Sequence, residues 1–247
     1  MGKAGGIVPV VTMYAKPAPV VCGAESFVYR GVKAARQRND AVYLIGPPSC
    51  LPLAKEVGVE VELWESYQST FDKFRREIGQ PKAPHARWYV LLEFMTRHGF
   101  DTVFYLEPDI TLFANVTEFV HHVLLPEERN VLLMQQGELL DPLPPSQTPP
   151  TTRVAAMTAL WSRAALEEFV EFHQFWLRRD PLNGRNHPRL LTELPDYSDE
   201  VILGWYAHSD CWSLLPPSGG GPKCAAEQRT GIDEKRAARI RGKFWPK

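Results

Sequence analysis

The chain has 247 residues, which is enough for one large domain or two small ones. Its 28 lysine and arginine residues balance 29 aspartate and glutamate residues. The resulting formal net charge of −1 excludes a protein whose main activity is to coat nucleic acid or an anionic membrane. Hydrophobic residues make up 44% and charged residues 23%, which excludes disorder along the whole chain.

The first third of the sequence alternates between strand-like and helix-like patterns. Residues 7–14 form a short apolar, β-rich run, and residues 25–38 place apolar side chains at helical spacing. A buried strand is predicted at 41–45, a short helix at 51–57 and an alternating strand at 59–63. Strands separated by helices are typical of a parallel sheet with helices on its faces, so the sequence predicts an α/β fold.

The remaining two thirds continue with helices and strands. Five prolines between 141 and 150 predict a loop there, and no apolar run approaches the ~20 residues that a membrane-spanning helix needs. The predicted elements are a helix at 84–98, strands at 102–106 and 130–134, a helix at about 116–124, a strand at 157–161, a helix at 163–179 capped by Ser162, and a short helix at 199–206.

The four cysteines lie at positions 22, 50, 211 and 224. None belongs to a C-x-x-C pair, so the sequence does not favour a structural zinc site. With so few thiols in so long a chain, we expect the cysteines to be reduced and mostly buried. A pair between Cys211 and Cys224 stays open if the protein is secretory.

Two carboxylates follow the predicted strand at 102–106. Residues two apart in an extended chain face the same way, so Glu107 and Asp109 are expected to point to one side of the strand's exit. Ligands of α/β sheets bind at the carboxyl ends of strands. Adjacent carboxylates repel each other unless a cation or a hydrogen-bond donor lies between them. A hard divalent ion with oxygen ligands, keeping positions for phosphate oxygens, is the natural partner.

Several segments together resemble the GT-A glycosyltransferases. Residues 87–94, followed by 101–106 and Glu107-Pro108-Asp109, resemble the nucleotide-sugar-binding half of that family, with its helix, hydrophobic strand and D-x-D motif. Residues 159–166 resemble the strand-to-helix turn on the acceptor side. Residues 198–206 resemble the segment that carries an acidic residue near the reaction centre. The resemblance spans roughly residues 7 to 215.

The resemblance implies a GT-A-like fold, with a mixed, mostly parallel sheet flanked by helices in a single domain. That domain is expected to cover 1–218, with the donor half at about 7–140 and the acceptor half at about 151–218. Residues 219–247 would form a basic C-terminal tail. The implied reaction moves a sugar from a nucleotide-diphosphate sugar to a hydroxyl group of a glycan or another acceptor.

The D-x-D motif of the family holds Mn²⁺ or Mg²⁺ on the nucleotide diphosphate, which makes Asp109 and Glu107 the expected metal ligands. This sequence departs from the motif in having Glu107 at the first acidic position and Pro108 in the middle. Two alternatives follow for Glu107: it binds the metal directly, or it contacts ribose or water and leaves the metal to Asp109. His208 is expected to complete the metal shell or to hold the leaving phosphate.

Four further residues are expected to contact the nucleotide-sugar donor. Thr12 and Tyr14, at the end of the first strand, are expected near the base and ribose. Arg87, at a helix start beside the site, is expected to meet a phosphate or the ribose. Lys235 belongs to a tail segment with a local net charge of +5 that follows a glycine hinge, so it is expected near phosphate oxygens as part of a lid.

Attack that inverts the anomeric carbon needs a base for the acceptor hydroxyl. Asp199 or Glu200 is the expected base, which favours inversion and leaves retention open. One alternative function is a nucleotidyltransferase that makes nucleotide-sugars. The other is a degenerate member of the fold that binds nucleotide or glycan without catalysis. No nucleic-acid partner is expected. The absence of a visible signal or anchor segment favours the cytoplasm, and the secretory lumen stays open if the chain is an excised domain.

Overall fold

The structure is a computed structural model of the 247-residue chain. It describes residues 6–14, 22, 26–78, 83–124, 131–135 and 154–178, together with Leu203 and Tyr206. The proline-rich segment 141–150 and the basic tail lie outside the described residues, so the expected boundary at 218 stays a prediction.

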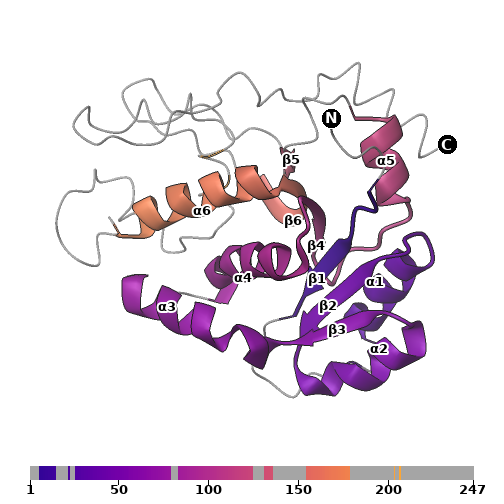
Figure 1. The fold of residues 1–247 in the computed structure, drawn as a ribbon. Coiled ribbons are helices and arrows are strands. Elements are labelled where there is room, and N and C mark those ends of the chain that lie inside the picture. Colours follow the sequence, from indigo (N-terminus) through magenta and orange to yellow (C-terminus); the bar gives the residue numbers. More distant parts are fainter. Residues whose placement is uncertain are drawn as a thin grey trace.

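A six-stranded sheet forms the centre of the described part of the chain (Figure 1). Its strand order is β3-β2-β1-β4-β6-β5. β1, β2, β3 and β4 pair in parallel, whereas β6 is antiparallel to both of its neighbours, β4 and β5. The mixed, mostly parallel sheet predicted from the sequence is thereby confirmed. The strands are β1 Val10–Met13, β2 Val42–Gly46, β3 Glu60–Leu63, β4 Thr102–Leu106, β5 Val131–Gln135 and β6 Val154–Ser162.

Helices cover both faces of the sheet, as Figure 1 shows. α3, α4 and α6 pack on one face, and α1, α2 and α5 pack on the other. The α-helices are α1 Phe27–Arg36, α2 Leu51–Val57, α3 Gln68–Ile78, α4 Ala83–His98, α5 Val116–His122 and α6 Arg163–Arg178, and the 3₁₀ helices are η1 Pro48–Cys50 and η2 Trp64–Tyr67.

The central strands are buried on both faces, which explains their continuous apolar sequences. Alternate residues of β1 point to opposite faces, so that Val11 and Met13 join the core under α4 while Val10 joins the core under α1. All four residues of β1 are buried. Because both faces of such a strand are buried, it can present side chains to a ligand only at its ends.

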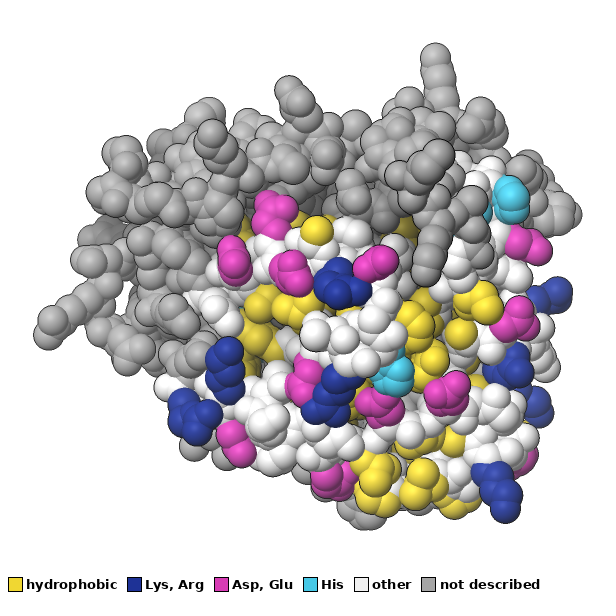
Figure 2. Space-filling view, viewed as in Figure 1, with side chains coloured by type: hydrophobic (Ala, Val, Ile, Leu, Met, Phe, Trp, Pro, Cys, Tyr) yellow, Lys and Arg dark blue, Asp and Glu magenta, His cyan; other side chains and the backbone are white. Residues whose placement is uncertain are grey.

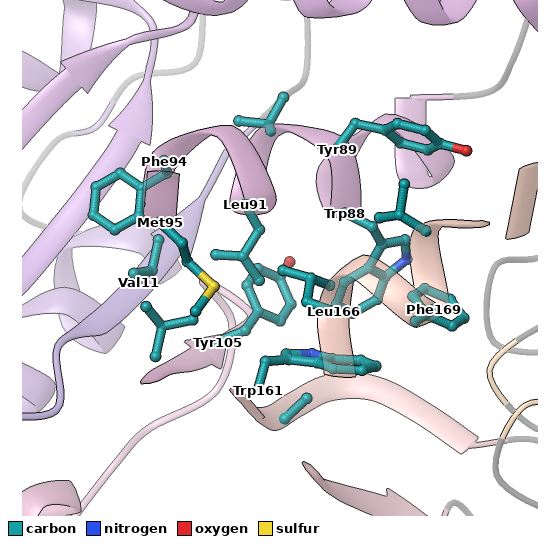
Figure 3. Packing of buried hydrophobic residues seen from close by; sticks show 14 of the residues in the cluster. Val11, Trp88, Tyr89, Leu91, Phe94, Met95, Tyr105, Trp161, Leu166 and Phe169 are labelled. Carbon is teal, nitrogen blue, oxygen red and sulfur yellow. The ribbon is translucent and has the colours of Figure 1, made fainter. Parts of the chain in front are cut away.

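Aromatic rings fill the core between the sheet, α4 and α6 (Figure 3). The ring of Trp88 on α4 lies 5.7 Å from that of Trp161 on β6, 5.4 Å from that of Tyr105 on β4 and 5.6 Å from that of Phe169 on α6. Edge-to-face pairs of this kind are worth about 0.5–1.5 kcal/mol each beyond the area they bury. They fix the position of α4 on the sheet, and α4 is the helix that carries Arg87.

Most predicted elements are present, with small shifts at their ends. The predicted helix at 51–57 coincides with α2, and the backbone N–H of Ala165 donates to the hydroxyl of Ser162 at 3.2 Å, which confirms the predicted cap of α6. α3 was not predicted, because its sequence is polar apart from Phe71, Phe74 and its last residue. The predicted helix at 199–206 lies outside the described residues except for Leu203 and Tyr206, which are helical and buried.

The prediction that the cysteines are reduced is wrong for two of them. Cys22 and Cys50 form a disulfide, with their Cα atoms 5.1 Å apart and a sequence separation of 28. Cys22 lies between β1 and α1, and Cys50 lies between β2 and α2, so the bond ties two neighbouring connections of the sheet together. Sequence spacing alone does not reveal such a pair, because it exists only once β1 and β2 lie side by side. Cys211 and Cys224 lie outside the described residues.

On the face shown in Figure 2, positively and negatively charged side chains are intermixed and do not form separate patches. Lysine and arginine side chains lie among aspartate and glutamate side chains over the described residues, with hydrophobic groups exposed between them. None of the helices in the described ranges has the length and apolar character needed to cross a membrane.

Candidate functional site

The carboxyl ends of the four parallel strands lie along one edge of the sheet. β1 leads into Tyr14, β2 ends at Gly46, β3 leads into Trp64, and β4 leads into Glu107. α/β folds bind their ligands outside this edge, where connections rather than strands present polar groups. The predicted carboxylates therefore lie where an α/β fold places its ligand site.

A tight turn holds the two carboxylates after β4. The backbone N–H of Ile110 donates to the carbonyl oxygen of Glu107 at 3.0 Å, which closes the turn around Pro108. Asp109 lies at its tip and is exposed, whereas Glu107 is partly buried, with 22% of its side chain exposed. The two carboxylates therefore face different surroundings, although they are only two residues apart.

α1 supports this turn through a close backbone contact. A Cβ atom placed on Gly31 would lie 2.6 Å from the carbonyl oxygen of Pro108 and 3.1 Å from that of Ile110. Only glycine allows the helix to approach so closely. Gly31 is not among the residues predicted for the site. The sequence does contain a clue to it, because Gly31 lies inside a predicted amphipathic helix. Glycine there costs about 1 kcal/mol of helix stability relative to alanine, so its presence indicates a packing requirement.

Arg87 forms an ion pair with Glu107 and lies over the aromatic core. Its guanidinium donates to a carboxylate oxygen of Glu107, and the same nitrogen, Nη1, lies 3.2 Å from the hydroxyl oxygen of Tyr105. The guanidinium carbon lies 5.8 Å from the ring centre of Trp88 and 5.9 Å from that of Tyr105. Only 16% of the arginine side chain is exposed. Arg87 thus neutralises Glu107 in a partly buried setting.

The side chains of Thr12 and Tyr14 make contacts inside the protein. Thr12 is 2% exposed, and its hydroxyl donates to the carbonyl oxygen of Leu106, which ties the end of β1 to the end of β4. The ring of Tyr14 is buried and lies 5.8 Å from that of Phe27, and its carbonyl oxygen accepts a hydrogen bond from the indole of Trp64. Both residues lie at the predicted edge, and their contact with a nucleotide stays a prediction.

The described residues contain part of the predicted metal site. Asp199, Glu200, His208 and Lys235 lie outside them. Across the described ranges, no three His, Cys, Asp or Glu residues lie close enough together to hold a metal ion. A site with one carboxylate still fits a hard divalent ion, because Mg²⁺ is commonly held by one or two carboxylates together with water and substrate phosphates. The exposed Asp109 meets that requirement.

A separate cleft of about 280 Å³ opens between α3, α4 and α6. It includes none of the residues predicted for the site, so the cleft and the carboxylates are distinct features. It is lined by Thr70, Lys73, Phe74, Tyr89, Leu92, Glu93, Thr96, Val170 and Gln174.

No protein-family model matches the sequence, and a comparison with curated proteins found no relative. Among solved structures, similarity is found to PaToxG glycosyltransferase, at 12% identity and a TM-score of 0.48 over 96% of this chain and 76% of that one. The glycosyltransferase GlyE of Streptococcus pneumoniae TIGR4 is 15% identical, at a TM-score of 0.44 over 83% of this chain and 44% of that one.

The similar structures also include CMP:2-keto-3-deoxy-manno-octonic acid synthetase in complex with CTP. It is 12% identical, at a TM-score of 0.41 over 72% of this chain and 84% of that one. Similarity at these TM-scores assigns no activity to this chain. The features that bear on function are those of the chain itself. Its mixed α/β sheet carries, at the carboxyl edge, an exposed aspartate beside an arginine–glutamate pair.

Proposed function

We propose that this protein is a glycosyltransferase that moves a sugar from a nucleotide-diphosphate sugar to a hydroxyl acceptor with the help of a divalent cation. One observation carries the proposal. The turn at Glu107-Pro108-Asp109 directly follows a parallel strand at the carboxyl edge and presents Asp109 to solvent. This is the edge of the sheet at which α/β folds bind their ligands, which supports the proposal.

The two acidic residues have different roles in this proposal. Glu107 is already paired with Arg87, and its contribution is to hold the guanidinium at the end of β4. Asp109 would hold Mn²⁺ or Mg²⁺ together with the diphosphate. The bound ion supplies Lewis-acid stabilisation of the negative charge that grows on the leaving diphosphate. This assignment takes the second of the two alternatives for Glu107, in which only Asp109 binds the metal directly.

Positive charge beside the turn supports the same reaction. The guanidinium of Arg87 suits phosphate or ribose oxygens, since it is planar, permanently charged and rich in donors. The aromatic rings beneath it keep it close to the carboxyl edge. Thr12 and Tyr14 would lie near the base and ribose, with Thr12 acting through the strand end that it fixes.

The acceptor side of the proposal rests on the resemblance alone. Asp199 or Glu200 would take the proton of the attacking hydroxyl, which favours inversion at the anomeric carbon. His208 would complete the metal shell or hold the leaving phosphate, and Lys235 would approach the phosphates from the tail. Each of these roles predicts loss of turnover in the corresponding alanine variant.

The test is a donor-hydrolysis and transfer assay with several nucleotide-sugars, with and without Mn²⁺. The decisive variant is Asp109→Asn, and the matched control is Asp101→Asn. Asp101 is an exposed carboxylate at the other end of the same strand, where it pairs with Arg163. We expect metal-dependent release of nucleoside diphosphate that is lost in Asp109→Asn and kept in Asp101→Asn.

The same assay separates the alternative functions. Consumption of a sugar 1-phosphate together with a nucleoside triphosphate would identify a nucleotidyltransferase. Nucleotide binding without turnover of any donor would identify a non-catalytic member of the fold. Full activity of Asp109→Asn would refute the metal role of Asp109.

A further inference from the structure

Three polar side chains meet inside the apolar core between α4 and α6. His173 of α6 is fully buried, and His85 and Tyr89 of α4 are 4% and 8% exposed. The Nε2 atom of His173 lies 3.0 Å from Nδ1 of His85, and its Nδ1 atom lies 3.1 Å from the hydroxyl oxygen of Tyr89. Both ring nitrogens of His173 are therefore engaged by α4.

A neutral His173 can satisfy both contacts. A neutral imidazole has one N–H donor and one bare nitrogen, so it donates to one neighbour and accepts from the other. Burial, reinforced by the adjacent His85, holds the pKa of His173 well below its ordinary value. The rings of Phe74 on α3 and Phe169 on α6 lie 6.5 and 5.6 Å from the imidazole and fix its plane.

The two contacts of His173 lie on either side of Arg87 along the helix. His85 and Tyr89 are four residues apart and share one face of α4, whereas Arg87 lies between them on the opposite side and reaches Glu107. All three residues belong to the first two turns of α4. The first backbone N–H groups of a helix lack helical acceptors, so this end frays easily unless side chains hold it.

We propose that His173 is a positioning residue of the donor site, which holds the first turns of α4 so that the guanidinium of Arg87 meets Glu107 and the donor diphosphate at the end of β4. This inference rests on the proposed function for the role of Arg87. The clamp itself is a property of the fold and is testable without any ligand.

The test uses two substitutions of His173 and one control. His173→Phe keeps an aromatic ring in the core and removes both nitrogens, whereas His173→Gln keeps one donor and one acceptor. Tyr206→Phe is the control, because the Tyr206 hydroxyl makes a buried hydrogen bond to the carbonyl oxygen of Ala165, at the other end of α6.

The first measurement is amide hydrogen exchange over residues 85–90, together with the side-chain Nε–H signal of Arg87 in NMR spectra. We expect exchange in His173→Phe to be about tenfold faster over these residues than in Tyr206→Phe, since loss of local contacts lowers the free energy of local opening. We also expect the Arg87 signal to shift, and His173→Gln to restore part of both. Exchange and Arg87 signals equal to those of the control would overturn the clamp.

The second measurement is the affinity for nucleoside diphosphate with Mn²⁺, determined both in the parent protein and in an Arg87→Ala background. We expect His173→Phe to weaken binding about tenfold, because small displacements of a positioning group cost that much or more. In an Arg87→Ala background the same change should have little further effect. An equal loss in both backgrounds would show that His173 does not act through Arg87. If the unmodified protein binds no nucleotide, the proposed function fails, and the exchange measurement still decides on the clamp.

Discussion

Replacing Gly31 by alanine tests whether α1 positions the acidic turn. The added Cβ atom would lie 2.6 Å from the carbonyl oxygen of Pro108, whereas ordinary van der Waals contact begins at 3.4 Å. The Pro108 carbonyl must therefore recede by about 0.8 Å, or α1 must move by the same amount. The obstacle is backbone on both sides, so no side-chain rotation relieves it. We expect the turn to move, because α1 is held along its whole length by the core.

Two opposing contributions set the stability of Gly31→Ala. Alanine is favoured over glycine inside a helix by about 1 kcal/mol. Overpacking of a close contact costs about 1–3 kcal/mol. The net loss of stability is therefore modest, about 1 kcal/mol, and the larger effect should fall on the site. A displacement approaching 1 Å is expected to weaken binding of nucleoside diphosphate with Mn²⁺ by about tenfold or more.

The assay pairs chemical denaturation with calorimetric titration of nucleoside diphosphate and Mn²⁺. Gly46→Ala is the matched control. It places the same methyl group at the same edge of the sheet, but with its nearest neighbour, Cys50 Sγ, at an ordinary 3.4 Å. A Gly31→Ala protein that is more stable than the parent by the full helix propensity and binds the nucleotide equally well would refute the close contact.

Two further predictions concern stability. Reduction of the disulfide, or the double substitution Cys22→Ser and Cys50→Ser, should destabilise the fold by about 3–4 kcal/mol, because the bond closes a loop of 28 residues in the unfolded chain; denaturation with and without reductant measures this. Burial, reinforced by His85, lowers the pKa of His173. Below pH 6.5 this histidine is therefore protonated in the unfolded chain but stays neutral in the folded protein. Stability should accordingly fall as the pH drops below 6.5, by up to about 1.4 kcal/mol per pH unit, and His173→Phe should flatten that dependence; an unchanged slope in the variant would contradict the assignment to His173.

Hydrophobic periodicity predicted the elements whose apolar residues are the ones that the fold buries. β1 and β2 are buried throughout and β4 is largely buried, so their apolar runs stand out in the sequence. α2 ends at Gly58, whose φ of 75° is the left-handed conformation that ends helices. α3 lacked such a signal. Among its described side chains only Phe74 is fully buried, and packing against α4 contributes to its stability as a helix.

The position of the site followed from topology, but its pairings did not. That Glu107 and Asp109 lie at the carboxyl edge follows from the order of strands and helices. That Arg87 pairs with Glu107 depends on the rotation of α4 about its axis, which the aromatic packing around Trp88 determines. The contact of Gly31 with the turn depends on the distance between α1 and β4. Both contacts depend on tertiary packing, which the local sequence does not determine.

The ion pair between Arg87 and Glu107 also explains how two carboxylates coexist at the end of one strand. Two unpaired carboxylates two residues apart would repel each other, which favours a positive charge beside them. Arg87 supplies that charge permanently at Glu107, and one negative charge, that of Asp109, faces solvent. A single exposed carboxylate binds divalent ions weakly, because it supplies only one ligand group. If Asp109 holds the metal, the diphosphate must therefore supply most of the remaining ligands. The ion and the donor would then bind together, each strengthening the other's affinity by the same factor.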